Sequence, residues 1–180
     1  MRRDIFVSVV VPLENDLDIL PTVVSELDAV MRGVNRYLNE RTGGEQYATV
    51  FYCTVERGGT MRWVNAGHPP PLLVRSGGHI EALPATGVPI GLFEEATVPA
   101  EETTLEAGDK LVIYTDGVTD AANTLHDFFG MKRLRDASAA AAFGSAREVH
   151  DCILQSLAAF AAGAEQRDDI TLAVLEYRPD

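Results

Sequence analysis

Two acidic segments of this 180-residue sequence have the residue types and spacing for chemistry. In the first, the apolar run 111–113 leads through a Tyr-Thr pair into Asp116 and Gly117. In the second, Asp168 and Asp169 stand directly before the final apolar segment. Adjacent carboxylates repel each other unless a cation or hydrogen bonds compensate, and hard divalent cations prefer carboxylate oxygens. From the spacing alone, a routine Asp-Gly turn and a solvated Asp-Asp loop are the stronger interpretations, with a metal site as the alternative.

Other chemical groups give weaker signals. None of the four histidines has a His or Cys at metal-ligand spacing, and no G-x-S-x-G segment provides a serine nucleophile. The two cysteines, Cys53 and Cys152, lie in apolar patterns typical of reduced core thiols. We therefore expect neither a zinc site nor Ser-His-Asp catalysis.

The elements that must position the carboxylates follow from hydrophobic periodicity. The pattern predicts strands over residues 5–11, 47–56, 60–65, 72–75, 79–83, 97–105, 110–115 and 170–177. Helices are expected from Pro21 to the Gly43-Gly44 pair, around 131–142, and from a capping box at Ser145 to Gly163. Glycine-containing turns at 57–59, 76–78 and 107–109 predict three hairpins. Hairpins followed by helices, without alternation of strand and helix, indicate an α+β fold.

Composition limits the classes of partner. The net charge is −12, from 15 basic and 27 acidic residues, so the surface repels nucleic-acid phosphates and anionic lipid. The longest apolar run, 5–13, is too short to span a membrane, and no cleavage site follows it. We expect a cytoplasmic protein that binds neither nucleic acid nor membrane. The length predicts one domain over 1–180, with an atypical strand and helix in 1–32 and a core in 33–180.

Five short motifs occur in an informative order. They are NAGHPP at 65–70, GVPIG at 87–91, GDKLVIYTDGV at 108–118, FG at 129–130 and DDIT at 168–171. Together they resemble the metal-dependent PPM phosphatases (protein phosphatase 2C-like). The resemblance is closest to the bacterial subgroup of the sporulation phosphatase and the stress-response sigma-factor regulators. It runs from about Val34 to Arg178.

The resemblance implies an α-β-β-α sandwich of two antiparallel sheets between helical layers. It also implies hydrolysis of phosphoserine or phosphothreonine on a partner protein, often a small anti-sigma-antagonist domain, with Mn²⁺ or Mg²⁺ as cofactor. By motif position, Asp116 and Asp168 would be the catalytic, metal-binding aspartates, and Asp169 a neighbouring metal residue. Gly117 would leave space for metal-bound water.

The sequence departs from the family pattern near its start. The family has a strand ending in Gly-Asp and a D-x-x-G-H-G segment, but the first glycine here is Gly33, so neither motif precedes Val34. Residues 5–31 instead resemble the first strand and helix of family-2 glycosyltransferases, although the D-x-D metal motif of those enzymes is not found at its usual place. We expect an N-terminally truncated or rearranged phosphatase domain.

These observations leave two main functional hypotheses. The first is a phosphoester hydrolase that binds one or two Mn²⁺ or Mg²⁺ ions and acts weakly on a phosphorylated protein or a small phosphoester. The second is a non-catalytic phosphatase remnant that serves as an interaction module. A nucleotide-sugar transferase is a distant third.

A homodimer is also expected from the sequence. Residues 5–11 form an apolar strand, and missing strands would leave open sheet edges that pair with another chain. Docking of the same strand within its own chain is the alternative.

Overall fold

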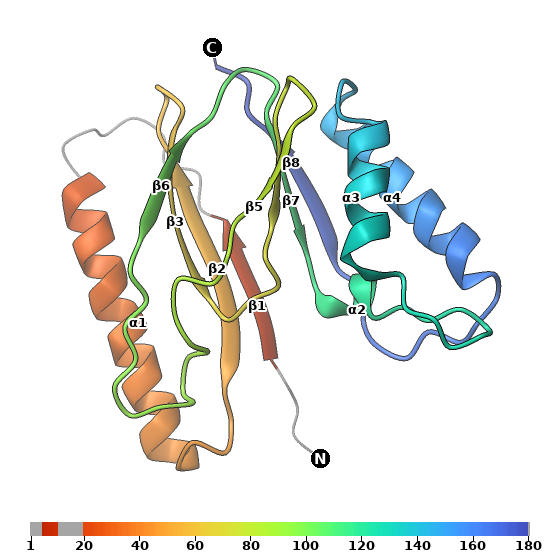
Figure 1. Ribbon diagram of the computed structural model, residues 1–180. Helices are drawn as coiled ribbons and strands as arrows, with labels where there is room; N and C mark the ends of the chain where they lie inside the picture. Colours follow the sequence, from red (N-terminus) through yellow and green to blue (C-terminus); the bar gives the residue numbers. More distant parts are fainter. Residues whose placement is uncertain (1–4, 11–19, 180) are drawn as a thin grey trace. The chain divides into compact units, whose positions relative to one another are not determined.

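The structure, a computed structural model, describes residues 5–10 and 20–179; for 5–10, 20–28 and 30 it describes the backbone alone. The chain forms two compact units. Unit 1 contains the residues up to His68 together with Pro84–Thr104, and unit 2 contains Pro69–Leu83 together with the chain from Leu105 onward. Each unit has its own four-stranded sheet, with one described helix in unit 1 and three in unit 2 (Figure 1).

Unit 1 is built on the sheet β1-β2-β3-β6. Its strands are β1 (Ile5–Val10), β2 (Ala48–Val55), β3 (Thr60–Ala66) and β6 (Glu101–Thr104). β1 pairs in parallel with β2, and the other pairs are antiparallel. Parallel strands need a crossover connection, and helix α1 (Leu20–Thr42) lies in this one. Unit 1 therefore contains one strand-helix-strand alternation that the sequence pattern did not predict.

Helix α1 is attached to its unit by apolar and polar contacts. Met31 and Leu38 pack against a cluster formed by Val50, Ala66 and Ile90. Asn35, which is 3% exposed, accepts a hydrogen bond from the Gly91 amide at 2.8 Å and donates to the carbonyls of Phe93 and Glu94. Although α1 is 23 residues long, no helix among the described residues is long and apolar enough to cross a membrane.

Unit 2 is built on the fully antiparallel sheet β5-β4-β7-β8. Its strands are β4 (Leu72–Val74), β5 (Ile80–Ala82), β7 (Lys110–Tyr114) and β8 (Leu172–Glu176). Every residue of β7 is buried, which agrees with its nearly continuous apolar sequence. A one-turn helix, α2 (Asp116–Thr119), follows β7 directly, and α3 (Gly130–Ala140) and α4 (Ala146–Ala161) come next.

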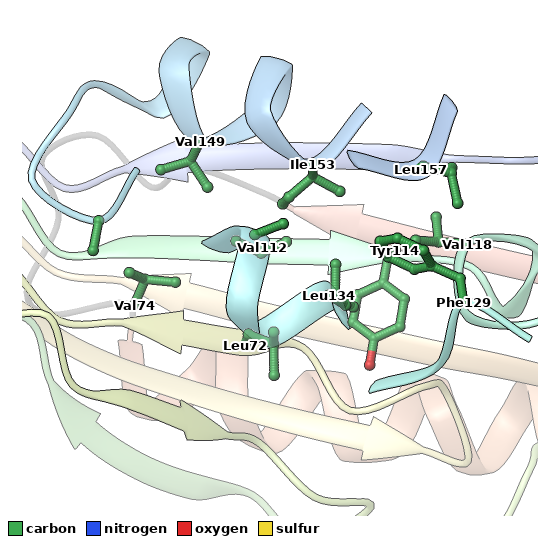
Figure 2. Packing of buried hydrophobic residues seen from close by; sticks show 12 residues of the cluster. Leu72, Val74, Val112, Tyr114, Val118, Phe129, Leu134, Val149, Ile153 and Leu157 are labelled. Atoms are coloured by element: carbon green, nitrogen blue, oxygen red, sulfur yellow. The ribbon is translucent and has the colours of Figure 1, made fainter. Parts of the chain in front are cut away.

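The helices of unit 2 cover one face of this sheet. From α4, Val149, Ile153 and Leu157 point toward β7, because a spacing of four residues places them on one side of the helix (Figure 2). Full burial of such side chains stabilises the fold by roughly 1.5–3 kcal/mol each. The remaining members of this core are Leu72, Val74, Val112, Tyr114, Val118, Phe129, Leu134, Ala137 and Ala142.

Most local predictions agree with the structure. The β2–β3 and β4–β5 hairpins form, and α4 begins with the predicted capping box, in which Glu148 donates its amide to the Ser145 hydroxyl and accepts from the Ser145 amide. The third hairpin is wrong. β6 pairs with β3, whereas β7 pairs with β4 and β8, so the turn at 107–109 connects two different sheets.

Candidate functional site

The antiparallel pairing of β7 with β8 brings the two acidic segments together within unit 2. Tyr114, the last residue of β7, is the register partner of Leu172, the first residue of β8. Asp116 follows the end of β7, and Asp168 and Asp169 precede the start of β8. Two segments that are 52 residues apart in the chain therefore meet at one end of the sheet (Figure 1).

Thr115 joins the two segments by hydrogen bonds. Its backbone amide donates to the carbonyl of Thr171 at 3.0 Å. Its hydroxyl donates to the carbonyl of Asp169 at 3.1 Å and accepts the amide of Thr171 at 3.0 Å. Thr115 is 7% exposed, whereas its partners Asp169 and Thr171 are exposed residues, so these bonds are partly buried. The separation of the acidic segments is thereby fixed by three bonds at one residue.

Gly117 permits this close approach. A Cβ atom at this position would overlap with the carbonyl oxygen of Asp169 and lie 3.0 Å from its carbonyl carbon. Real side chains essentially never come so close to a backbone carbonyl. The expected role of Gly117, space for metal-bound water, stays a prediction, and the contact with Asp169 gives a separate reason for glycine.

The local environments of the carboxylates differ. Asp116 opens α2, and its Oδ1 atom is buried; its carbonyl accepts the amide of Asp120 at 2.7 Å. Asp168 and Asp169 are exposed, and the Asp168 carboxylate accepts the Asp169 amide at 2.8 Å. The arrangement thus has one half-buried carboxylate beside two that are open to solvent.

The carboxylates of Asp116, Asp168 and Asp169 are the kind of ligand that a divalent cation binds. Carboxylate oxygens are the ligands that Mn²⁺ and Mg²⁺ prefer, and the predicted residues Asp116, Asp168 and Asp169 come from two segments that are held together. In the part of the chain that the structure describes, no three acidic, His or Cys side chains gather closely enough to hold one ion. The described residues would therefore supply few ligands to such an ion, and water would occupy positions that they leave open.

The sequence analysis missed the residues that position the site. Tyr114, 1% exposed, donates its hydroxyl to the Pro70 carbonyl at 2.9 Å, and burial raises the pKa of Tyr114 well above its ordinary value. The hydroxyl consequently stays protonated and fixes the end of β7. In the sequence, Thr115 and Thr171 stand out only as members of the GDKLVIYTDGV and DDIT motifs. The signal that could have indicated the positioning role of Thr115 is its place between a buried strand and Asp116.

Comparison with known proteins identifies relatives over most of the chain. The family model of stage II sporulation protein E (SpoIIE) matches residues 9–178. Protein IcfG of Synechocystis is 34% identical over 87% of this chain. Phosphoserine phosphatase RsbU of Bacillus subtilis is 26% identical over 90%. The chain spans 24% of the length of IcfG and 48% of the length of RsbU.

Solved structures agree with the fold. The RsbU and RsbW domains of Rv1364c from Mycobacterium tuberculosis match 87% of this chain and 42% of that chain, with 27% identity and a TM-score of 0.66. The SpoIIE phosphatase domain with a regulatory fragment, from Bacillus subtilis, matches 89% of this chain and 48% of that chain, with 19% identity and a TM-score of 0.69. The expected α+β fold with antiparallel sheets is confirmed.

The match also revises the expected boundary of the resemblance. The family model begins at residue 9, whereas the motifs supported a likeness only from about Val34. The resemblance of residues 5–31 to glycosyltransferases is not supported by these comparisons. The chain belongs to the SpoIIE family of PP2C-type phosphatase domains.

Proposed function

We propose that this chain is a metal-dependent phosphoester hydrolase whose reaction centre lies at the shared end of β7 and β8. The observation that supports this most is the bonding of Thr115 to the Asp169 carbonyl and the Thr171 amide, because it holds Asp116 beside Asp168 and Asp169. One solved relative, the PstP catalytic domain, is described in complex with two manganese ions. Mn²⁺ or Mg²⁺ is accordingly the proposed cofactor.

Each residue has a distinct part in this proposal. Asp116 and Asp168 hold the cation through their carboxylates, and Asp169 adds negative charge beside it. When bound, a divalent ion polarises the phosphoryl oxygens and acidifies a water molecule. Thr115 and Gly117 act as positioning residues, since they set how closely the two acidic segments approach.

The proposed activity has a low rate and a broad range of phosphoester substrates. Residues 1–33 contain neither the Gly-Asp nor the D-x-x-G-H-G segment of the family, so the cation ligands in this proposal are Asp116 and Asp168, with Asp169 beside them. With fewer carboxylates to hold metal ions, less positive charge would be available to stabilise the anionic transition state. Activated aryl phosphates, whose leaving group needs little assistance, are expected to react faster than phosphoserine.

The proposed physiological substrate is a phosphorylated protein. Two relatives, RsbP and RsbU, are named phosphoserine phosphatases. The alternative function, a non-catalytic interaction module, is favoured by the absence of a three-ligand cluster in the described residues. The hydrolase requires the carboxylates for turnover, whereas the interaction module has no turnover that depends on them.

Hydrolysis of p-nitrophenyl phosphate with Mn²⁺ tests the proposal. The Asp116→Asn variant keeps the size of the side chain and removes its charge, and it is expected to lose at least about 100-fold in rate. Asp136→Asn is the matched control, because Asp136 is an exposed residue of α3 that pairs with Lys132 at the surface. Equal rates for the wild type and Asp116→Asn, or no turnover at all, would favour the interaction module.

A homodimer is proposed through the edge of unit 1. β1 lies at the end of its sheet and pairs with β2 of its own chain, as in the intramolecular alternative. Its sequence, IFVSVV, has one polar residue, and an apolar edge strand is a template for pairing with a second copy. Light scattering coupled to size exclusion should give twice the chain mass at micromolar concentration. A mass near 19.5 kDa contradicts the dimer.

A further inference from the structure

One loop of unit 2 presents large apolar side chains to solvent. Leu125 is 79% exposed and Phe128 is 60% exposed, and both lie between α2 and α3. Figure 1 shows this loop at the same end of unit 2 as α2 and the segment before β8. Exposed apolar residues that gather on a small surface often mark a binding site.

The loop is held in one conformation by its own hydrogen bonds. The Asn123 side chain accepts the amides of Leu125 and Asp127, both at 2.9 Å, and donates to the Asp127 carboxylate. Arg133 donates to the carbonyls of Phe128 and Phe129, both at 3.1 Å. An ordered loop loses little conformational entropy when a ligand binds, so Leu125 and Phe128 are preorganised for binding.

Arg167 connects this loop to the acidic segments. Its Nη2 lies 3.2 Å from Nδ1 of His126. A guanidinium has donors only, so the histidine nitrogen is the acceptor. Arg167 precedes Asp168 directly, and it is the only Lys or Arg in residues 120–130 and 162–171. Arg167 therefore contacts the apolar loop through His126 and directly precedes the acidic pair of the proposed reaction centre.

We infer that the recognition surface, defined as Leu125, His126, Phe128 and Arg167, is the place where a phosphorylated protein segment docks beside Asp168. This inference rests on the proposed function. Arg167 pairs with the phosphoryl group, and Leu125 and Phe128 contact an apolar side chain next to the phosphorylated residue. Charge complementarity favours this docking, because the chain carries a net charge of −12 and an anionic ligand needs a local cation to approach. With five N–H donors, Arg167 can bind His126 and phosphoryl oxygens together.

Peptide binding without turnover tests this inference. The probe is a fluorescein-labelled peptide with one phosphoserine flanked by leucines, measured by anisotropy in EDTA. We expect it to bind more tightly than its unphosphorylated counterpart. Arg167→Ala should weaken phosphopeptide binding about tenfold and leave the unphosphorylated peptide unaffected, with Arg167→Lys in between. The Leu125→Ser/Phe128→Ser double variant should weaken binding of this phosphopeptide, but not of one with serines in place of the leucines.

Phe143→Ser is the matched control, because Phe143 is an 82% exposed aromatic residue of the α3–α4 connection. It should leave every affinity unchanged. Equal affinity for the phosphorylated and unphosphorylated peptides, no detectable binding, or an equal loss in Phe143→Ser would overturn the inference. Normal Arg167-dependent binding without any hydrolysis in Mn²⁺ would count against the proposed function alone.

Discussion

The hydroxyl of Thr115 donates to the backbone carbonyl of Asp169 at 3.1 Å, across a sequence separation of 54 residues. The same oxygen accepts the amide of Thr171, so one side chain satisfies two backbone groups of the segment that carries the Asp168–Asp169 pair. The geometry of the acidic site thus depends on a neutral residue next to Asp116.

Replacement of Thr115 by valine tests this dependence. Valine keeps the shape of the buried Thr115 side chain but removes its hydroxyl, which leaves the Asp169 carbonyl and the Thr171 amide without this partner. We expect a loss of about 1–3 kcal/mol in the free energy of unfolding, measured by urea denaturation. Thr115→Ser retains the hydroxyl and should recover most of the stability. A serine variant as unstable as the valine variant would show that the methyl group, rather than the hydroxyl, matters.

Gly117→Ala should separate the two acidic segments. The added methyl group meets the carbonyl of Asp169, and backbone atoms must shift to relieve the overlap. The expected cost is roughly 1–3 kcal/mol in stability, together with a lower rate of p-nitrophenyl phosphate hydrolysis. Gly77→Ala is the control, because no atom lies within 4 Å of a Cβ there. Similar melting temperatures for both variants would contradict the close-approach role.

The chain order explains why sequence analysis found the acidic residues but could not show that they meet. The turn residues at 57–59 and 76–78 predict hairpins because both partners are local in sequence. The pairing of β7 with β8 joins strands separated by α2, α3 and α4, and no local pattern encodes it. The turn at 107–109 has the same composition as a hairpin turn, yet it connects two sheets.

Helix boundaries also differ in whether they depend on local sequence or on distant neighbours in the fold. The capping box at Ser145 was predicted because its two hydrogen bonds link residues that are three apart. The one-turn helix α2 was missed because Asp-Gly is typical of turns, and only its neighbours in the fold reveal the helical turn. The parallel β1–β2 pair was missed because an isolated apolar strand does not indicate its direction.

Asp109 should make unit 2 sensitive to acid. Burial alone would raise the pKa of Asp109, but bonds from the amides of Glu106 and Ser76 and from Arg75 outweigh it and hold this pKa below its ordinary value. A lowered pKa in the folded state stabilises the protein above the unfolded pKa of about 3.9, and this contribution is lost as the pH falls through the folded pKa.

Urea denaturation between pH 7 and pH 3 measures this contribution. Asp109→Asn should be less stable than the wild type at pH 7 by about 1–3 kcal/mol, and the difference should shrink at low pH. Asp136→Asn removes an exposed carboxylate and should follow the wild-type curve within about 0.5 kcal/mol. A pH-independent difference for Asp109→Asn would mean that the ionised carboxylate is not the stabilising form.

Asn35→Ala should destabilise unit 1. The substitution removes a buried amide that bonds to Gly91, Phe93 and Glu94, and it leaves three backbone groups without this partner. We expect a loss of about 2–4 kcal/mol and faster hydrogen exchange at the Gly91 amide. Arg36→Ala, at the neighbouring exposed position of α1, should leave both unchanged. Unchanged exchange at Gly91 in Asn35→Ala would contradict the anchoring role.

Calorimetric titration with Mn²⁺ tests the central claim, that Asp116 and Asp168 hold the same cation, most directly. The account predicts saturable binding to the wild type and a loss of at least about tenfold in affinity for both Asp116→Asn and Asp168→Asn. The double variant should lose less than the two single losses combined, because both substitutions disrupt one site. Mn²⁺ affinity that is unchanged by either substitution, or losses that simply add, would contradict the account.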